Sequence, residues 1–408
     1  MIKRFASLLA VIFLMACLLT PMGIAAAKGA VSFWVYEPEL KREQLEKAVA
    51  LFERETGYDV EITYIPKSDF NTKLNTAIAT GQAPEVSYLD QPLVPRFAVD
   101  GILLNLDPYA DGKTGIDRSK YYQGALNTNV VGKKLYGLPL NQTCVALYYN
   151  RDLIKTPPTT WDEWIDMAKK VYKKGQIAAM EVPPGGGWGA WLFPAFVASA
   201  GGRMVSDDET KVAFDEQPAI DALKLWLEMR KYSDKEVQDS ANSFQNGLVA
   251  TKISGPWEIS GFRQNFPNLK FGVALVPAKT KDGIHASNIG GENLVIYKSA
   301  KNPQAAWELI RFLTYRPENA ILCAEVTGNF PVLLEAAQDD RYRKDESLKV
   351  FLKQMETAQA RPRMTSWLKI NDEIVGKALD QALSGELSPE EALKQAAKKA
   401  NLLIQRDK

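Results

Sequence analysis

Three short apolar-rich runs near the start of the chain are predicted to be strands, and the second alternates apolar and polar residues as a strand with one buried face does. They are residues 31–36, 59–65 and 85–90. Helical spacing of apolar residues separates these runs, and in the first helical segment Leu45, Val49 and Phe52 share a face that ends at Gly57, a C-cap residue. The order β-α-β-α-β predicts an α/β protein that begins as a doubly wound parallel sheet.

Later segments continue to mix the two patterns. Residues 135–150 are predicted to be extended, Thr160 and Glu163 have capping-box spacing, and Asn302 is placed to cap another helix. The C-terminal stretch from Leu348 is predicted to be largely helical. At 408 residues the chain is too long for one ordinary core, so two lobes are expected. Since no low-complexity linker separates them, the chain should cross between lobes in short segments.

The first 27 residues are predicted to be a signal peptide rather than part of the fold. Lys3 and Arg4 form a positive start, an apolar stretch follows, and small residues precede a cleavage site before Lys28. An alternative is a lipoprotein, because the residues ending at Cys17 resemble a lipobox. Both interpretations export the protein, which predicts an extracytoplasmic location.

Charge and composition narrow the function further. The net charge is +1, and removing the signal peptide leaves 48 basic residues against 49 acidic ones. This balance argues against nucleic acid or an anionic membrane surface as the main partner. Cys144 and Cys323 are compatible with one disulfide or with two separate buried thiols. The single histidine, His285, rules out histidine-based zinc clusters and triads, and no metal site, cofactor or catalytic residue is predicted.

Several longer motifs resemble those of a known family. They are 244–262 (FQNGLVATKISGPWEISGF), 271–278 (FGVALVPA), 290–314 (GGENLVIYKSAKNPQAAWELIRFLT) and 327–332 (TGNFPV). Their order is that of sugar-type extracellular solute-binding proteins, the maltose-binding-protein-like receptors of ABC importers. Upstream segments at 138–153 and 157–164 and the closing 385–401 also match, so the resemblance covers nearly all of the mature chain.

This resemblance implies a two-lobe periplasmic-binding-protein fold of class II, with a mostly parallel, helix-flanked sheet in each lobe. The crossings are expected near 140–143, 288–292 and 329–334. The N-terminal lobe is then 28–140 with 292–330, and the C-terminal lobe is 141–291 with 331–408. The resemblance further implies a monomer that binds a carbohydrate between the lobes. Its partners would be the transmembrane subunits of an ABC permease, and membrane association would occur only through that permease or a lipid anchor at Cys17.

A sugar site needs aromatic rings to stack on C–H faces and planar polar groups to bind hydroxyls. Five of the nine tryptophans are explained by strands or helices and are expected in the core or in local packing: Trp34, Trp161, Trp164, Trp226 and Trp307. Trp257 and Trp367 match cleft tryptophans of the family, and Trp188 falls where the family places an aromatic residue. We therefore predict that these three contact the ligand, whereas Trp191 is expected to pack internally.

Four polar residues are predicted to join them. Asp90 ends the third strand, and Glu37 follows the first, both at positions where the family contacts ligand; a helix cap and a solvated charge are the respective structural alternatives. Asn141 and Glu292 lie near two crossings, where Glu292 could instead orient the hinge. The family's acid beyond the first crossing is replaced here by residues 141–143 (Asn-Gln-Thr), so maltose itself is not predicted.

Two other functions remain open from the sequence. A glycosidase would need a pair of carboxylates across the sugar bond, for which Asp90, Glu258 and Glu292 are available, but no spacing indicates such a pair. A related receptor could instead bind a glycerol-phosphate ester, a polyamine or iron. The tryptophan-rich segments favour a sugar.

Overall fold

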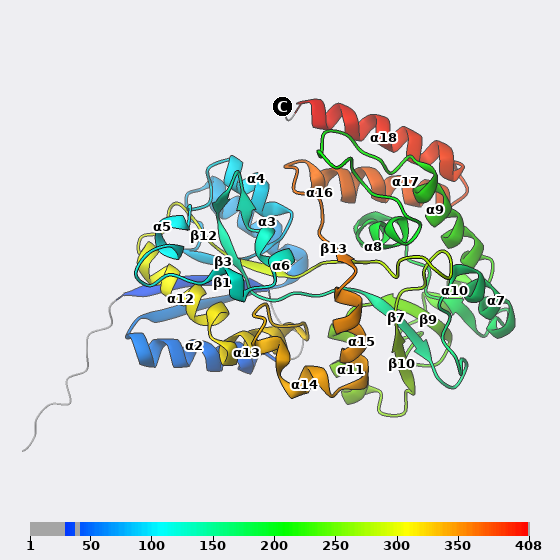
Figure 1. The fold of residues 1–408 in the computed structure, drawn as a ribbon, viewed down its shortest axis with the longest axis horizontal. Coiled ribbons are helices and arrows are strands. Elements are labelled where there is room, and N and C mark those ends of the chain that lie inside the picture. The colour runs from blue at the N-terminus through cyan, green and yellow to red at the C-terminus, as the bar shows by residue number, and fades with distance from the viewer. Residues whose placement is uncertain (1–28, 37–40, 407–408) are drawn as a thin grey trace, which may run out of the picture.

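The computed structural model describes residues 29–36 and 41–406. The predicted signal peptide (1–27), Cys17 and Glu37 lie outside the described residues. The chain forms two α/β lobes side by side, the first built mainly from the blue, cyan and yellow segments and the second from the green, orange and red ones (Figure 1). Within the described residues, no helix has the length and apolar character needed to cross a membrane.

The sheet of the first lobe has five strands. Their order is β2 (Asp59–Ile65), β1 (Ala30–Tyr36), β3 (Val86–Asp90), β12 (Glu292–Ile296) and β6 (Gly137–Pro139). β1 is parallel to β2 and β3, which confirms the predicted β-α-β-α-β start. β12 is antiparallel to both β3 and β6 because it enters the lobe at the end where β3 finishes, with Glu292 opposite Asp90.

The sheet of the second lobe has four strands. Their order is β10 (Phe271–Ala274), β7 (Ala146–Asn150), β9 (Val249–Ser254) and β8 (Ala178–Met180). Only β8 and β9 are parallel, and β7 is antiparallel to both of its neighbours. The expectation of a mostly parallel sheet in each lobe is therefore wrong in detail. Both sheets are mixed, because strands that leave or enter through the crossings run against the others.

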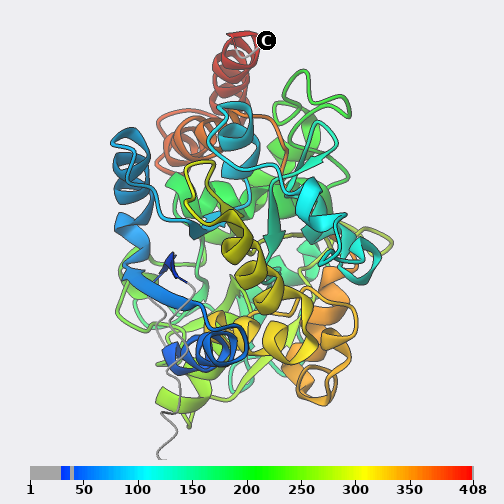
Figure 2. The ribbon, with the colours of Figure 1, turned by 90° about the vertical axis from the view of Figure 1, so that its left-hand side faces the viewer.

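Helices cover both sheets. Those of the first lobe are α2 (Arg42–Thr56), α3 (Lys67–Ala79), α4 (Leu93–Val99), α5 (Asp107–Ala110), α6 (Gln123–Asn127), α12 (Pro303–Tyr315), α13 (Pro317–Thr327) and α14 (Asp340–Arg343). Those of the second are α7 (Trp161–Val171), α8 (Gly186–Ser199), α9 (Gln217–Arg230), α10 (Lys235–Gln238), α11 (Trp257–Asn265), α15 (Glu346–Met355), α16 (Trp367–Lys369), α17 (Gly376–Leu383) and α18 (Pro389–Arg406). Figure 2, turned to the side of the first lobe, shows the yellow α12 facing the viewer.

Short elements complete the fold. Two 3₁₀ turns (Arg118–Lys120 and Ala336–Gln338), a π-helical stretch (Ile370–Val375) and two small strand pairs lie between the main elements. The pairs are β4 (Val130–Val131) with β5 (Lys134–Leu135), and β11 (Ser287–Asn288) with β13 (Ala358–Gln359).

Local sequence signals explain several element boundaries. In α2, Leu45, Val49 and Phe52 are buried, and Gly57 ends the helix in the left-handed region at φ 76°. The Thr160 side chain accepts a hydrogen bond of 3.2 Å from the amide of Glu163, and Asn302 caps α12 in the same way. These predicted helix starts and stops are confirmed.

The cores are rich in aromatic side chains. Trp164, Trp226 and Trp307 are fully buried and Trp161 nearly so, as expected, while Trp34 is half-buried in β1. Cys144 and Cys323 are both buried free thiols, so no disulfide joins them. Burial raises the pKa of Cys323 to about 12 and that of Cys144 further still.

Three crossing segments meet between the lobes. Gln142 and Phe330 exchange two backbone hydrogen bonds of 2.9 Å, and Thr143 and Gly290 exchange two of 3.0 and 2.9 Å. Gly291 has φ 130°, and a Cβ there would lie 2.3 Å from the carbonyl oxygen of Asn141, so this close approach requires glycine. The three segments therefore lie side by side, with residues 142–143 in the middle.

The division of the chain into lobes stays a proposal, and the contacts after the third crossing bear on it. The amide of Tyr122 donates to the carbonyl of Val332, and the amide of Leu334 donates to Lys120, both at 2.9 Å. The chain thus still packs on the first lobe at Leu334. By α15, it packs on β7 and β10 of the second lobe.

Candidate functional site

A cavity of about 550 Å³ lies at the crossing segments, with walls from both lobes. We call it the main cavity. Three tryptophans from α8 and α11 form one wall, and the ends of β1, β3 and β12 supply polar side chains to the other. Ligands of α/β proteins bind at the carboxyl ends of parallel strands, and β1 and β3 both end here.

The tryptophan wall consists of Trp188, Trp191 and Trp257. The rings of Trp188 and Trp191 stack at 5.3 Å and 17°, and both lie close to Trp257, at 6.4 and 6.2 Å. Trp188 is 39% exposed, which is unusual for so large an apolar ring. The structure thus places two of the predicted tryptophans, Trp188 and Trp257, on the cavity wall.

Two glycines leave room for the Trp257 side chain and backbone. The Trp257 ring folds back over Gly255, where a Cβ atom would lie 1.8 Å from the ring. On its other side, the backbone of Trp257 packs against Gly328, which has φ 68°. A side chain at Gly255 would displace the ring, so the glycine before this tryptophan determines where the indole lies.

Two tryptophan predictions need correction. Trp367 is 1% exposed and packs in the hydrophobic core of the second lobe, because the chain turns into α16 there and directs the ring inward. Trp191, expected to pack internally, is half-buried and lines the main cavity. Its signal was its spacing: Trp188 and Trp191 are three residues apart, so a helix places them on one face.

Asp90 is held by an arginine that the sequence analysis missed. Arg361, just after β13, donates to both carboxylate oxygens of Asp90, at 2.6 and 3.2 Å. The Arg361 side chain is 10% exposed, and its Nε atom has no hydrogen-bond partner among the described residues. The pair brings together residues 271 positions apart, and that separation hid it from the sequence.

Glu292 lies beside this pair at the start of β12. Its Oε1 is 3.9 Å from Lys67 Nζ, and its buried Oε2 has no partner within the described part of the chain. The Lys67 ammonium in turn lies 5.3 Å from the centre of the Tyr36 ring. Burial raises the pKa of Tyr36 well above its ordinary value, and Asp90 and Glu292 raise it further. Lys67 could have been predicted, because it begins the helix directly after β2.

Asn141 does not line the main cavity. It is fully buried, and its Oδ1 accepts hydrogen bonds from Asn329 Nδ2 at 3.2 Å and from the Glu292 amide at 3.3 Å. Its Oδ1 thus joins the crossing segments to one another, whereas its buried Nδ2 has no partner in the described structure, and ligand contact by Asn141 stays a prediction. Glu37 cannot be placed, since it lies outside the described residues.

Several polar atoms around the main cavity are buried without a partner in the described structure. They are Tyr88 Oη, Glu292 Oε2, Asn329 Oδ1 and Arg361 Nε, all on residues that line it. Native proteins pair most buried polar atoms, so such a group needs a water or a ligand to complete it. Both donors and acceptors are represented, which suits hydroxyl groups, because each hydroxyl can donate and accept.

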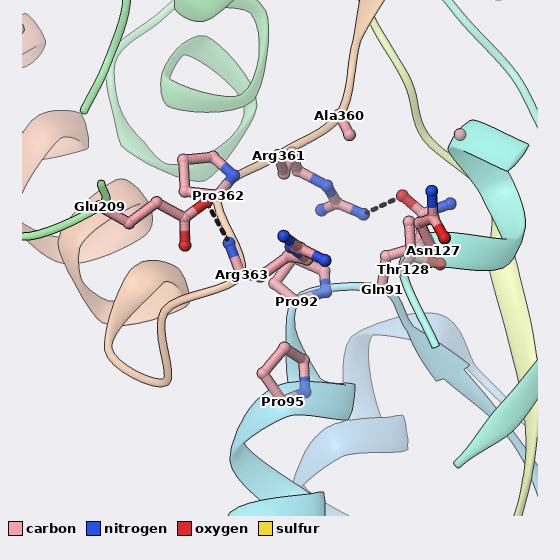
Figure 3. Close-up of a pocket in the computed structure, with 11 residues that line it drawn as sticks. Gln91, Pro92, Pro95, Asn127, Thr128, Glu209, Ala360, Arg361, Pro362 and Arg363 are labelled. Atoms are coloured by element: carbon pink, nitrogen blue, oxygen red, sulfur yellow. Dashed lines mark hydrogen bonds between the residues drawn. The ribbon is translucent and has the colours of Figure 1, made fainter. Parts of the chain in front are cut away.

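A second, smaller cavity of about 270 Å³ shares Arg361 with the main one. Figure 3 shows Arg361 and Gln91 directed toward each other, with Nη2 of the arginine 3.4 Å from Oε1 of the amide. On another side of this cavity, the Arg363 amide donates to Glu209. Arg361 therefore separates two cavities between the lobes.

The structure offers no metal centre among the residues it describes, since no cluster of three His, Cys, Asp or Glu side chains could hold an ion. His285 instead bonds through Nδ1 to the carbonyl of Val276 at 2.8 Å.

Comparison with known proteins gives consistent matches. The family model of bacterial extracellular solute-binding proteins matches residues 47–350. The maltotriose-binding protein of Pyrococcus abyssi is 28% identical, over 75% of this chain and 67% of its own. The galactooligosaccharide-binding protein of Bacillus subtilis is 26% identical, over 90% and 88%. A solved solute-binding protein of an ABC transporter from Thermotoga lettingae, bound with α-D-tagatose, is 28% identical, with a TM-score of 0.80 over 92% of this chain and 100% of its own.

Proposed function

The chain belongs to the bacterial extracellular solute-binding proteins, and we propose that it captures a di- or oligosaccharide in the main cavity and delivers it to an ABC permease. The single observation that carries this proposal is the three-tryptophan wall facing unpartnered polar atoms across one cavity. The sugars named for the relatives support it. Trp257, Trp188 and Trp191 would stack on the sugar, and Asp90, Glu292 and Arg361 would bind its hydroxyls.

Binding would favour the closed arrangement of the lobes. The tryptophans belong to the second lobe, whereas Asp90 and Glu292 end and begin strands of the first. A ligand that touches both walls binds the closed state better than the open one and so increases its population. The closed surface is then what the permease recognises. We further propose that the exported protein acts as a monomer outside the cytoplasm, freely soluble or anchored at Cys17.

The rival functions have less support. Glu258, one carboxylate available to a glycosidase, lies 3.2 Å from Lys252 and 2.9 Å from Ser254 and does not line the main cavity. Asp90 is engaged by Arg361 through two hydrogen bonds. These contacts give Glu258 and Asp90 partners within the protein, which favours binding over the two-carboxylate arrangement that hydrolysis needs. The same ion pair neutralises the arginine that a phosphate ester would need. We therefore propose binding without turnover.

A thermal-shift screen against mono-, di- and oligosaccharides tests the proposal. A ligand at 100 times its dissociation constant stabilises the folded state by about 2.7 kcal/mol, enough for a clear rise in Tm. Trp257→Ala should abolish that rise, measured from the variant's own unliganded Tm, which should fall somewhat because a half-buried ring is lost. If no sugar raises the Tm, or if incubation releases smaller sugars, the proposal is wrong.

A further inference from the structure

A third cavity, of about 410 Å³, lies next to the main one. Five residues line both: Lys41, Ser260, Glu325, Gly328 and Asn329. Beyond them the walls come from α11, α14 and α15. We call this cavity the side chamber. The side chamber therefore offers a second space beside the one that a molecule on the tryptophan wall would occupy, with Ser260 at the boundary.

The side chamber contains unmet hydrogen-bonding groups of its own. Tyr342 is 3% exposed, and its hydroxyl has no partner in the described part of the chain. Asn329, where the two cavities join, is 7% exposed, and its Oδ1 is also unpartnered. One group can donate and the other accepts. Because an unmet buried polar group is destabilising, its presence in both residues points to an incoming partner.

Both arginines of the side chamber are already paired with carboxylates. Arg263 contacts Asp345 through both of its terminal nitrogens, at 2.6 and 3.1 Å. Arg341 pairs with Glu325 at 2.6 Å and with Asp339 at 2.9 Å. These guanidinium groups therefore need no anionic ligand to neutralise their charge. They still present N–H donors, which neutral hydroxyls can use.

Apolar surface completes the chamber. Pro256, Ile259 and Leu348 line it beside the polar groups. Alternating apolar contact and hydrogen-bonding groups suits a sugar ring, which has C–H faces and hydroxyl edges. None of the chamber's lining residues is a tryptophan, so this unit would be held by hydrogen bonds more than by stacking.

We propose that the ligand is a neutral oligosaccharide of at least three units, and that the unit beyond the tryptophan wall enters the side chamber and bonds to Tyr342. This inference rests on the proposed function. It assigns Tyr342 as a residue that sets the preferred chain length, while the tryptophans determine that the ligand is a sugar.

Isothermal titration with maltose, maltotriose and maltotetraose, and with galacto-oligosaccharides of two to four units, tests this. Wild type should bind three-unit sugars at least ten-fold more tightly than two-unit sugars of the same series. Tyr342→Phe should weaken three-unit binding about five-fold, the effect of one hydrogen bond, and leave two-unit binding unchanged. Leu348→Trp, which replaces a lining residue by a larger side chain and so reduces the space in the chamber, should remove the preference for length. Tyr232→Phe is the matched control, because Tyr232 is half-buried and lines none of the three cavities. It should change the affinity for neither two-unit nor three-unit sugars.

The outcomes separate the inference from the function it rests on. If wild type binds sugars but two- and three-unit sugars bind equally, the side chamber is not a subsite. The same follows if the length preference survives Leu348→Trp, and an unchanged preference in Tyr342→Phe overturns the role of its hydroxyl. If no sugar binds wild type at all, the proposed function itself fails.

Discussion

The Asp90–Arg361 pair should show strong energetic coupling. Asp90→Asn would leave a guanidinium that is only 10% exposed without its counter-charge, whereas Arg361→Gln would leave a carboxylate that is 35% exposed. Removing one partner of a buried ion pair costs about 3–5 kcal/mol. For Asp90→Asn we expect a loss of about 3 kcal/mol in the free energy of unfolding, the lower end of this range. Because water can reach Asp90, we expect about 2 kcal/mol for Arg361→Gln.

The double variant removes both charges, so neither is left unpaired. Its cost should be about 3 kcal/mol, well below the sum of the single costs, which gives a coupling of about 2 kcal/mol. Urea unfolding of wild type, the two single variants and the double variant measures these terms. Repeating the cycle in 1 M NaCl distinguishes a buried pair from an exposed one, because salt screens only the latter strongly.

Additive single costs, within about 0.5 kcal/mol, would refute this reasoning. So would a coupling that disappears in 1 M NaCl, since that would show the pair to be solvent-screened. Either result would mean that Arg361 does not hold Asp90 in place at the cavity wall.

Three further predictions concern other parts of the structure. Gly255→Ala should lower the free energy of unfolding by about 1–3 kcal/mol and weaken sugar binding, because the new Cβ would overlap the Trp257 indole ring. Its control is Gly261→Ala, where no atom lies within 4 Å of the new Cβ; this variant should stabilise α11 slightly in a thermal melt. Asp345→Ala should lose about 1 kcal/mol, because Asp345 caps α15 through two backbone amides. Burial alone would raise the pKa of Asp345, but hydrogen bonds from an arginine and from backbone amides lower it overall. Wild type should therefore lose the stability that the Asp345 cap contributes as the pH falls below about 4, whereas Asp345→Ala should show no such loss. Protein lacking residues 1–27 contains no Cys17, so only Cys144 and Cys323 can react with a thiol reagent. At pH 8 neither should react until urea unfolds the chain. Rapid reaction in the native state would contradict their burial and their raised pKa values.

Much of the fold could be predicted because the signals are local. The helix face of Leu45, Val49 and Phe52 and the cap at Asn302 depend only on neighbouring residues. The directions of β7 and β12 could not be predicted in this way. An apolar strand has the same pattern whether it pairs in parallel or antiparallel, and its direction depends on where the chain enters the sheet.

The candidate site was predicted where the residue type itself was unusual. Trp188 and Trp257 stood outside ordinary strand and helix patterns, and both line the main cavity. Trp367 looked similar but is buried, because the inward turn of the chain before α16 is not visible in the sequence. Arg361 carries no local signal, since its partner comes from another lobe.

The sequence by itself determined most of the strands and helices, and it predicted both export and the presence of tryptophans outside the expected core. Those properties follow from composition and short-range spacing. Only the tertiary structure decided which aromatic rings reach the main cavity, which charges are paired across the crossing segments, and that a side chamber opens beside Tyr342. Each of these depends on contacts between residues far apart in the chain, and such contacts exist only once the two lobes have packed.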